Sequence, residues 1–176
     1  MKLEIRQLTH AGLLAALSII LTRLAAVMVL NTIRLSFGTI PIYMAGLLFG
    51  PSIGGLVGAV ADLVGFLINP FGATFVPHIF LASVMRGIIP PLVVRAIGNN
   101  GNNWLPKVIV SVFAAELVSG IFLTTWGLSW LLGQEFLVIL PPRLIAMLVQ
   151  VPVYAFFTFA LTSKLRYYVT AYHAGR

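Results

Sequence analysis

The sequence predicts an all-α integral membrane protein: a six-transmembrane-helix bundle forming one domain over residues 1–176, with both termini cytoplasmic. Two features of composition predict this class. Hydrophobic residues make up 60% of the chain and charged residues only 9%, and the mean hydropathy is +1.03. A soluble domain carries about a quarter charged residues. Since about 20 apolar residues cross a bilayer, this length allows roughly six spans with short loops.

Six apolar stretches follow one another along the chain. They cover residues 11–30, 37–49, 51–68, 75–97, 105–130 and 138–168. The clearest loop between them is 99–103, which contains only Asn and Gly. The second stretch would reach only about 20 Å as a helix, less than the ~30 Å hydrocarbon core. The last is longer than a bilayer requires, so we expect it to tilt or to extend into water.

The basic residues indicate the orientation. An even number of spans places both termini on one side of the membrane. Seven of the eleven basic residues lie on that side, namely Lys2, Arg6, Arg95, Lys107, Lys164, Arg166 and Arg176. Arg23, Arg34 and Arg143 lie on the other side, and Arg86 falls in mid-span. Because cytoplasmic loops carry the excess of Lys and Arg, both termini are predicted to be cytoplasmic. We expect the chain to be a multi-pass protein of the plasma membrane.

The third stretch carries a stripe of small residues that includes a carboxylate. At 100° per residue, Gly54, Gly58, Gly65 and Asp62 fall on one face. Small residues allow another helix to approach closely, so this face should turn toward the bundle. Two interpretations of Asp62 remain. It is either a structural carboxylate paired with Arg86 or with backbone, or an acceptor for an NH-rich ligand ring.

The other polar residues also share helix faces. His78 and Arg86 are in one row of the fourth stretch, and no second His stands four residues from His78, so we predict no metal site. Two further sets of residues each share one helix face: Ser111, Ala115, Ser119, Phe122 and Trp126 on the fifth stretch, and Arg143, Met147, Gln150 and Tyr154 on the sixth. Glu116 lies about 60° from the first of these faces, which favours a structural role.

Most of these polar groups belong to the outer half of the predicted bundle. They are Arg23, Asn31, Arg34, Asn69, His78, Trp126, Arg143 and Gln150. This asymmetry predicts a cup that opens outward, lined by aromatic rings, amides and arginines. Such a lining suits a flat, hydrogen-bonding ligand with carboxylates, because Arg binds carboxylates bidentately and stacks on planar rings. The alternative is an aromatic belt with arginines that extend to the interface.

No enzyme signature is present. The chain has neither a phosphate-binding G-x-x-x-x-G-K-[ST] loop nor an H-E-x-x-H pair. Any energised transport must therefore draw on a partner or an ion gradient. Ala11 and Ala15 form a small-xxx-small pair at the start of the first stretch, which indicates close helix packing within the bundle or with another protein.

Four runs of residues resemble a known family, the S components of energy-coupling factor (ECF) transporters. They are LSFGTIPI at 35–42, AGLLFGP at 45–51, GGLVGAVADLVGF at 54–66 and NPFGATF at 69–75. The last is most similar to the folate-specific branch. The resemblance covers most of the first half of the chain and the six-helix plan, whereas the second half is less distinctive.

The resemblance implies how the protein would work. S components capture a vitamin near the extracellular face and dock onto a membrane scaffold subunit that carries two cytoplasmic ATPases. The helix-one motif through which they dock maps onto Ala11 and Ala15. No cofactor is expected in the chain, since ATP would be used by the partners.

For folate, candidate ligand contacts fall into three groups. Asp62, Asn69 or Gln150 would read the pterin edge, Phe66, Phe75 or Trp126 would stack on it, and Arg23, Arg34 or Arg143 would hold the carboxylates. Asn31, His78 and Arg86 complete the candidate set. Sibling branches that take pantothenate, pyrimidine or pyridoxine compounds can use the same groups. A membrane scaffold subunit without a ligand and a lipid-modifying enzyme using Asp62, His78 or Glu116 are the alternatives from other classes.

Overall fold

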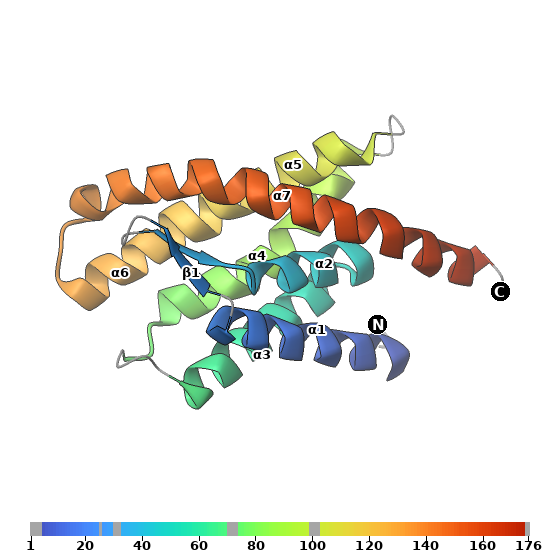
Figure 1. The fold of residues 1–176 in the computed structure, drawn as a ribbon, viewed down its shortest axis with the longest axis horizontal. Helices are drawn as coiled ribbons and strands as arrows, with labels where there is room; N and C mark the ends of the chain where they lie inside the picture. Colours follow the sequence, from blue (N-terminus) through green and yellow to red (C-terminus); the bar gives the residue numbers. More distant parts are fainter. Residues whose placement is uncertain (1–4, 25, 30–32, 70–73, 99–102, 175–176) are drawn as a thin grey trace.

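A computed structural model describes residues 5–24, 26–29, 33–69, 74–98 and 103–174, and side chains of 6, 24, 26–29, 33–35 and 166–174 are left out of the description. The chain folds into a helical bundle with one small β-hairpin at one end (Figure 1). The first turn of α1 and the last turns of α7 lie at the opposite end. We call these two ends the hairpin end and the termini end.

The first apolar stretch is divided between a helix and a strand. α1 covers Ile5–Leu24, β1 covers Ala26–Val29, and β2 covers Ile33–Ser36. The strands pair antiparallel, with Ala26 opposite Ser36 and Val29 opposite Ile33. The prediction of one helix over 11–30 is therefore wrong beyond Leu24, whereas the predicted all-α class is confirmed, since nearly all described residues are helical. The reason is local: β-branched and long apolar residues that flank a short polar segment favour a hairpin over continued helix.

The next three helices agree with the sequence. α2 is Thr39–Phe49, α3 is Pro51–Ile68 and α4 is Pro77–Ile97. α2 has 11 residues, which confirms that the second stretch is short. Gly50 separates it from α3 with φ of 98°, a left-handed value that other residues adopt at a cost. Pro51 then starts α3, where its missing N–H has no intrahelical partner to lose.

α2, α3 and α4 meet through three glycines, Gly46, Gly54 and Gly87, which we call the glycine crossing. A methyl group on Gly46 or Gly54 would overlap the carbonyl oxygen of Gly87. A methyl group on Gly87 would overlap the carbonyl of Gly54. The helices therefore touch through backbone atoms, as the stripe of small residues predicted for α3.

The second half of the bundle consists of two long helical rods. The first contains α5 (Trp104–Ala115), η1 (Glu116–Leu123) and α6 (Thr124–Leu132), where η1 is π-helical. The second is α7 (Phe136–Ala174), with Pro141, Pro142 and Pro152 inside it. α7 runs the full length of the molecule (Figure 1). Its 39 residues confirm that the last helix is longer than a bilayer needs.

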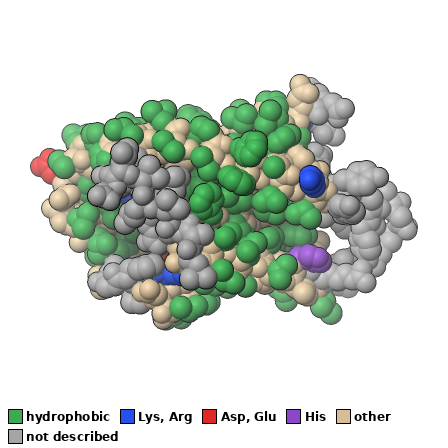
Figure 2. All heavy atoms as spheres, in the orientation of Figure 1, with side chains coloured by type: hydrophobic (Ala, Val, Ile, Leu, Met, Phe, Trp, Pro, Cys, Tyr) green, Lys and Arg blue, Asp and Glu red, His purple; other side chains and the backbone are tan. Residues whose placement is uncertain are grey.

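Four helical segments among the described residues are long and apolar enough to cross a membrane: Pro51–Ile68, Pro77–Ile97, Trp104–Leu132 and Phe136–Leu165. α2 is apolar but shorter. Among the described side chains on the face shown in Figure 2, hydrophobic ones predominate, as expected for a surface that contacts lipid. The six-span count and the cytoplasmic side of the termini stay predictions.

Candidate functional site

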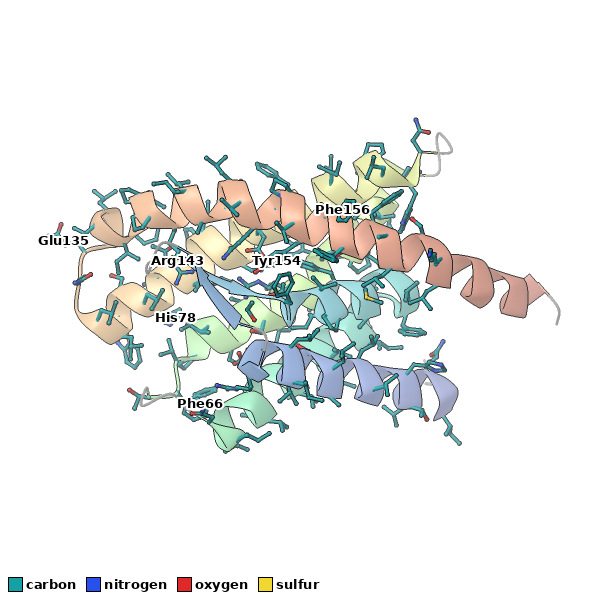
Figure 3. The ribbon with its side chains drawn as sticks, in the orientation of Figure 1. Phe66, His78, Glu135, Arg143, Tyr154 and Phe156 are labelled. Carbon is teal, nitrogen blue, oxygen red and sulfur yellow. The ribbon has the colours of Figure 1, made fainter. Side chains whose placement is uncertain are left out.

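The candidate site lies at the hairpin end, where most of the polar residues predicted for the cup are found. Figure 3 shows Phe66, His78 and Arg143 at this end of the bundle, on α3, α4 and α7. Arg23 is in the last turn of α1 and Trp126 is in α6. Five separate helices thus contribute to one region.

Arg23 reaches from α1 across to α3. Its guanidinium lies over Gly65, since a methyl group on Gly65 would be 3.2 Å from the Nη2 atom of Arg23. It also lies near enough to Asp62 to interact with it electrostatically. The small residue at position 65 therefore makes room for the arginine, a use that the stripe of small residues did not predict.

Aromatic rings form two groups beside these polar side chains. Phe75, just before α4, packs edge-on against Phe66 with ring centroids 5.5 Å apart. His78 stacks on Trp126 at 5.4 Å and 29°. The Nδ1 atom of His78 is buried and makes no hydrogen bond to the described residues. The second group therefore joins α4 to α6 and retains an unused polar atom.

Arg143 is a partly buried cation on α7. Within the described part of the chain, it makes no ion pair or hydrogen bond, although it lies close enough to Glu116 and Arg86 for electrostatic interaction. Its helix face is the predicted one: Met147 and Tyr154 are buried and Gln150 is half-buried. A partly buried guanidinium with spare donors is suited to bind a carboxylate.

The residues predicted to share one face of the fifth stretch differ in burial. Ser111, Ala115 and Ser119 are fully buried, whereas Phe122 and Trp126 are about half exposed, at 53% and 50%. The cause is the π-helical η1, whose hydrogen bonds close one residue later than in an α-helix, so the 100° spacing fails there. Glu116, predicted to lie off this face, is instead buried.

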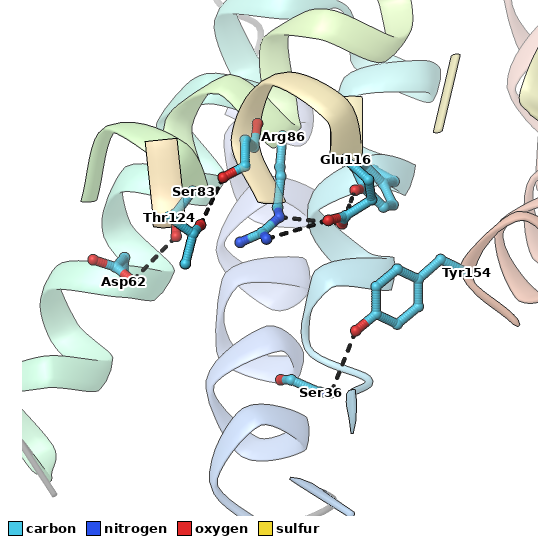
Figure 4. Close-up of polar contacts among 9 residues, drawn as sticks. Ser36, Asp62, Ser83, Arg86, Glu116, Thr124 and Tyr154 are labelled. Carbon is cyan, nitrogen blue, oxygen red and sulfur yellow. Dashed lines mark hydrogen bonds and ion pairs between the residues drawn. The ribbon is translucent and has the colours of Figure 1, made fainter. Parts of the chain in front are cut away.

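Glu116 forms a buried charge pair with Arg86 in the middle of the bundle (Figure 4). Arg86 donates from Nε and Nη2 to the two carboxylate oxygens, at 3.3 and 3.4 Å. The Tyr43 hydroxyl donates to the same carboxylate at 2.5 Å. The structural role of Glu116 fits these contacts, and Tyr43 was missed by sequence reasoning. The signal that could have found such a cluster is the acidic residue itself, since a carboxylate within an apolar span requires a partner.

Asp62 is held by a different residue from the one expected. The ion-pair partner of Arg86 in the structure is Glu116, not Asp62. Asp62 instead accepts a hydrogen bond of 3.1 Å from Ser83 on α4 (Figure 4). Helix phase explains the difference, since Ser83 lies where α4 packs closely against α3 at Gly58. The predicted pairing of Asp62 with Arg86 or with backbone is thus replaced by the hydrogen bond from Ser83. Its side chain stays partly accessible, and its role as a ligand acceptor stays a prediction.

Three further predicted residues have a limited description. Asn31 lies outside the described residues. Arg34 is in β2, opposite Met28, and its side chain lies outside the description. Asn69 follows α3, is exposed, and donates its backbone N–H to Gly65.

The small-xxx-small pair of α1 faces the bundle. Ala11 and Ala15 are each 4% exposed and belong to the hydrophobic core. Two packing partners were considered for this pair, the bundle itself and another protein. In the structure, the pair packs within the bundle. One position further along, Gly12 and Ala16 form a second small-xxx-small pair that is exposed, and Gly12 has nothing within 4 Å of its missing methyl group.

A shallow hollow occurs at the termini end of the molecule. It lies where α2 and α4 finish, between Phe49, Gly50, Pro91 and Arg95. None of the residues predicted for the ligand site lines it, and Arg95 is exposed at its edge.

Comparison with known proteins gives matches over nearly the whole chain. Residues 2–167 match the model of the family described as ECF-type riboflavin transporter, S component. The folate transporter FolT of Clostridium novyi (strain NT) is 27% identical over 152 residues, which span 86% of this chain and 85% of the relative.

Two solved structures have a similar fold. A crystal structure of FolT bound with folic acid matches with a TM-score of 0.76 and 26% identity, over 92% of this chain and 95% of that one. The S component of a bacterial ECF transporter matches with a TM-score of 0.64 and 21% identity, over 91% and 97%. The second similarity supports the fold alone.

Proposed function

We propose a function from one premise, that this chain belongs to the family of ECF-type riboflavin transporter S components. The chain is a membrane transport protein of this kind rather than an enzyme. Our proposal is that it captures a folate-type vitamin at the hairpin end, which faces the outside of the bacterial plasma membrane. It then delivers the vitamin together with partner subunits that hydrolyse ATP.

Arg143 is the observation that carries the choice of ligand. A folate has a flat pterin ring and a glutamate tail with two carboxylates, whereas riboflavin carries no charge. The partly buried guanidinium of Arg143 has no bonded counterion among the described residues. Arg23 lies at the same end, over Gly65. Two cations beside stacked rings favour an anionic, planar ligand.

Riboflavin is the second candidate, favoured by the description of the family. The aromatic groups Phe66–Phe75 and His78–Trp126 suit the rings of either vitamin. The two ligands differ in their dependence on the arginines, because only the folate offers carboxylates.

Equilibrium binding to the purified protein tests the proposal. Wild type is expected to bind a reduced folate more tightly than riboflavin. Arg143→Ala should weaken folate binding about 10- to 100-fold, since hydrogen bonds to charged groups are worth about 1.5–3 kcal/mol. Arg95→Ala is the matched control, an exposed arginine at the termini end, and should leave affinity unchanged.

Three other binding results would change or reject this proposal. Tight binding of riboflavin alone would transfer the proposal to the second candidate. Equal losses for both ligands in Arg143→Ala would exclude a carboxylate contact. The absence of binding to either vitamin at micromolar concentration would reject vitamin capture.

The exposed side of α1 is our proposed docking surface for the membrane scaffold subunit. Gly12 and Ala16 lie one turn apart on it and leave room for a second helix to approach closely. We propose Gly12 and Ala16 as the docking residues instead of Ala11 and Ala15, because the latter two are buried. Gly12→Leu should abolish co-purification with the scaffold and the ATPases without changing vitamin affinity. Ser52→Leu, exposed at the start of α3, is the control, and equal loss in both variants would reject this surface.

A further inference from the structure

The hollow at the termini end lies where three helices begin or end. It has a volume of about 250 Å³ and is lined by residues 46–50 together with Pro91, Val94 and Arg95. Beside it α2 ends, α3 begins at Pro51 and α4 approaches its end at Ile97. Both α3 and α4 are long and apolar enough to cross a membrane. The hollow therefore lies at the edge of the apolar layer, at the depth where helix ends meet lipid headgroups.

The hollow is apolar inside and has a cation at its edge. Gly46 and Pro91 are buried, and Val94 is half-buried, whereas Arg95 is exposed. Gly50 keeps space open beside the guanidinium, since a methyl group there would be 3.4 Å from the Nη2 atom of Arg95. Its φ of 98° also disfavours any residue that would fill this space with a side chain.

Arg95 has donors to spare. Among the described residues, its side chain makes neither an ion pair nor a hydrogen bond. Lys107 differs, because it is only 9% exposed and donates from Nζ to the carbonyl of Gly98, just after α4, at 2.9 Å. The planar guanidinium of Arg95 is thus available for an anion, and its fork of N–H groups matches the oxygens of a phosphate.

The charge of the termini end also favours an anion. The acidic residues that the structure describes lie elsewhere: Asp62 and Glu116 form hydrogen bonds within the bundle, and Glu135 is at the hairpin end (Figure 3). At the termini end, Arg95 and Lys164 are both exposed. The potential around the hollow is therefore positive, which attracts negatively charged groups.

We propose that this hollow binds an anionic phospholipid. The guanidinium of Arg95 binds the phosphate, and the apolar lining receives the glycerol and the first acyl carbons. A zwitterionic lipid offers the same phosphate, but its ammonium group is repelled by the positive charge of this end. The site lies at the opposite end of the bundle from the proposed vitamin site, so it does not depend on the proposed function.

Native mass spectrometry of the purified full chain in detergent tests the proposal. The protein is titrated with phosphatidylglycerol or with phosphatidylcholine of the same acyl chains. Wild type should bind phosphatidylglycerol more tightly, and Arg95→Gln should weaken this binding about 5-fold, the effect of one basic group at a membrane surface. Lys164→Gln is the matched control, because it removes an exposed charge of the same end outside the hollow. It should leave the affinity unchanged.

A second variant tests the shape of the site. Val94→Phe fills the hollow and keeps the arginine, so it should also weaken phosphatidylglycerol binding. Inorganic phosphate should not displace the bound lipid, because it cannot use the apolar lining.

Four results would overturn the proposal. Equal affinities of wild type for the two lipids would remove the preference for an anion. Equal losses in Arg95→Gln and Lys164→Gln would mean diffuse surface charge instead of a site. Displacement of the lipid by inorganic phosphate would assign the site to a free anion. Unchanged lipid affinity in Arg95→Gln, together with lost co-purification of the scaffold subunit, would make the hollow a protein contact.

Discussion

In the middle of the bundle, helices touch through backbone atoms and a fully paired charge cluster, whereas at the hairpin end they meet through rings and arginines. At the glycine crossing, not even a methyl group fits between α2, α3 and α4. Nearby, Arg86 has Glu116 as its counterion. At the hairpin end, Arg143 has no bonded counterion and the Nδ1 atom of His78 has no hydrogen bond within the described residues.

This difference separates stability from binding. Arg86, Glu116 and Tyr43 in the middle bond to one another, so changing one of them should destabilise the fold. Groups at the hairpin end have donors to spare, so changing one should mainly affect a ligand. The following predictions test this division by substitutions in each region.

The largest effect is expected for Glu116→Gln in the middle of the bundle. Arg86 would then be a buried charge without a counterion, which costs about 3–5 kcal/mol of unfolding free energy. Denaturation of the purified protein in detergent measures this loss. The double variant Arg86→Met with Glu116→Leu should recover most of it, because apolar residues of similar size can replace a buried pair. A single variant as stable as wild type would mean that the pair contributes nothing to the fold.

Gly87→Ala should have the next largest effect. Its methyl group would overlap the carbonyl of Gly54, so α3 and α4 must separate, at a cost of about 1–3 kcal/mol. Gly12→Ala is the matched control, because nothing lies within 4 Å of that position. Thermal unfolding should show a lower midpoint for Gly87→Ala and an equal or slightly higher one for Gly12→Ala. Equal midpoints in the two variants would show that the crossing tolerates expansion.

Arg143→Met should have the smallest effect on the ligand-free protein. It removes a partly buried charge that has no bonded counterion among the described residues, so the free energy of unfolding should stay the same or rise by up to about 1 kcal/mol. Folate stabilisation of the same variant, measured as the shift in unfolding midpoint on adding the vitamin, should decrease strongly. A loss of stability without ligand as large as that of Gly87→Ala would contradict the division between the two regions.

The middle of the bundle was the more predictable region. Gly54, Gly58 and Gly65 recur at helical spacing. This spacing shows that they share one side of the helix, even before any contact is known. The break between α2 and α3 followed from Gly50 and Pro51 in the same way. By contrast, the partner of Arg86 could not be deduced, because it depends on how α4 is rotated against η1. From the sequence, Asp62 and Glu116 were equally good candidates for the counterion of Arg86.

The gathering of polar residues at the hairpin end was predicted from their residue types and their depth in the spans. It was not predicted from contacts between particular side chains. Arg23, His78 and Arg143 do gather there, but the stacking of His78 on Trp126 depends on helix ends that periodicity does not define. The burial of Ala11 and Ala15 shows the same limit, since a small-xxx-small pair identifies close packing and not the packing partner. The hairpin after α1 was missed because β1 read as a continuation of the first apolar span and β2 fell in the break between the first two spans.

The π-helical segment Glu116–Leu123 also bears on how the sequence can change in length. Each of its hydrogen bonds encloses one residue more than in an α-helix. Deleting a single residue here would let the segment return to α-helical geometry while the flanking helices keep their directions. Related chains can therefore differ by one residue within this span and still place the helix ends at the same points. Alignments of this family should permit a gap here, in the interior of a membrane helix, where gaps are ordinarily avoided.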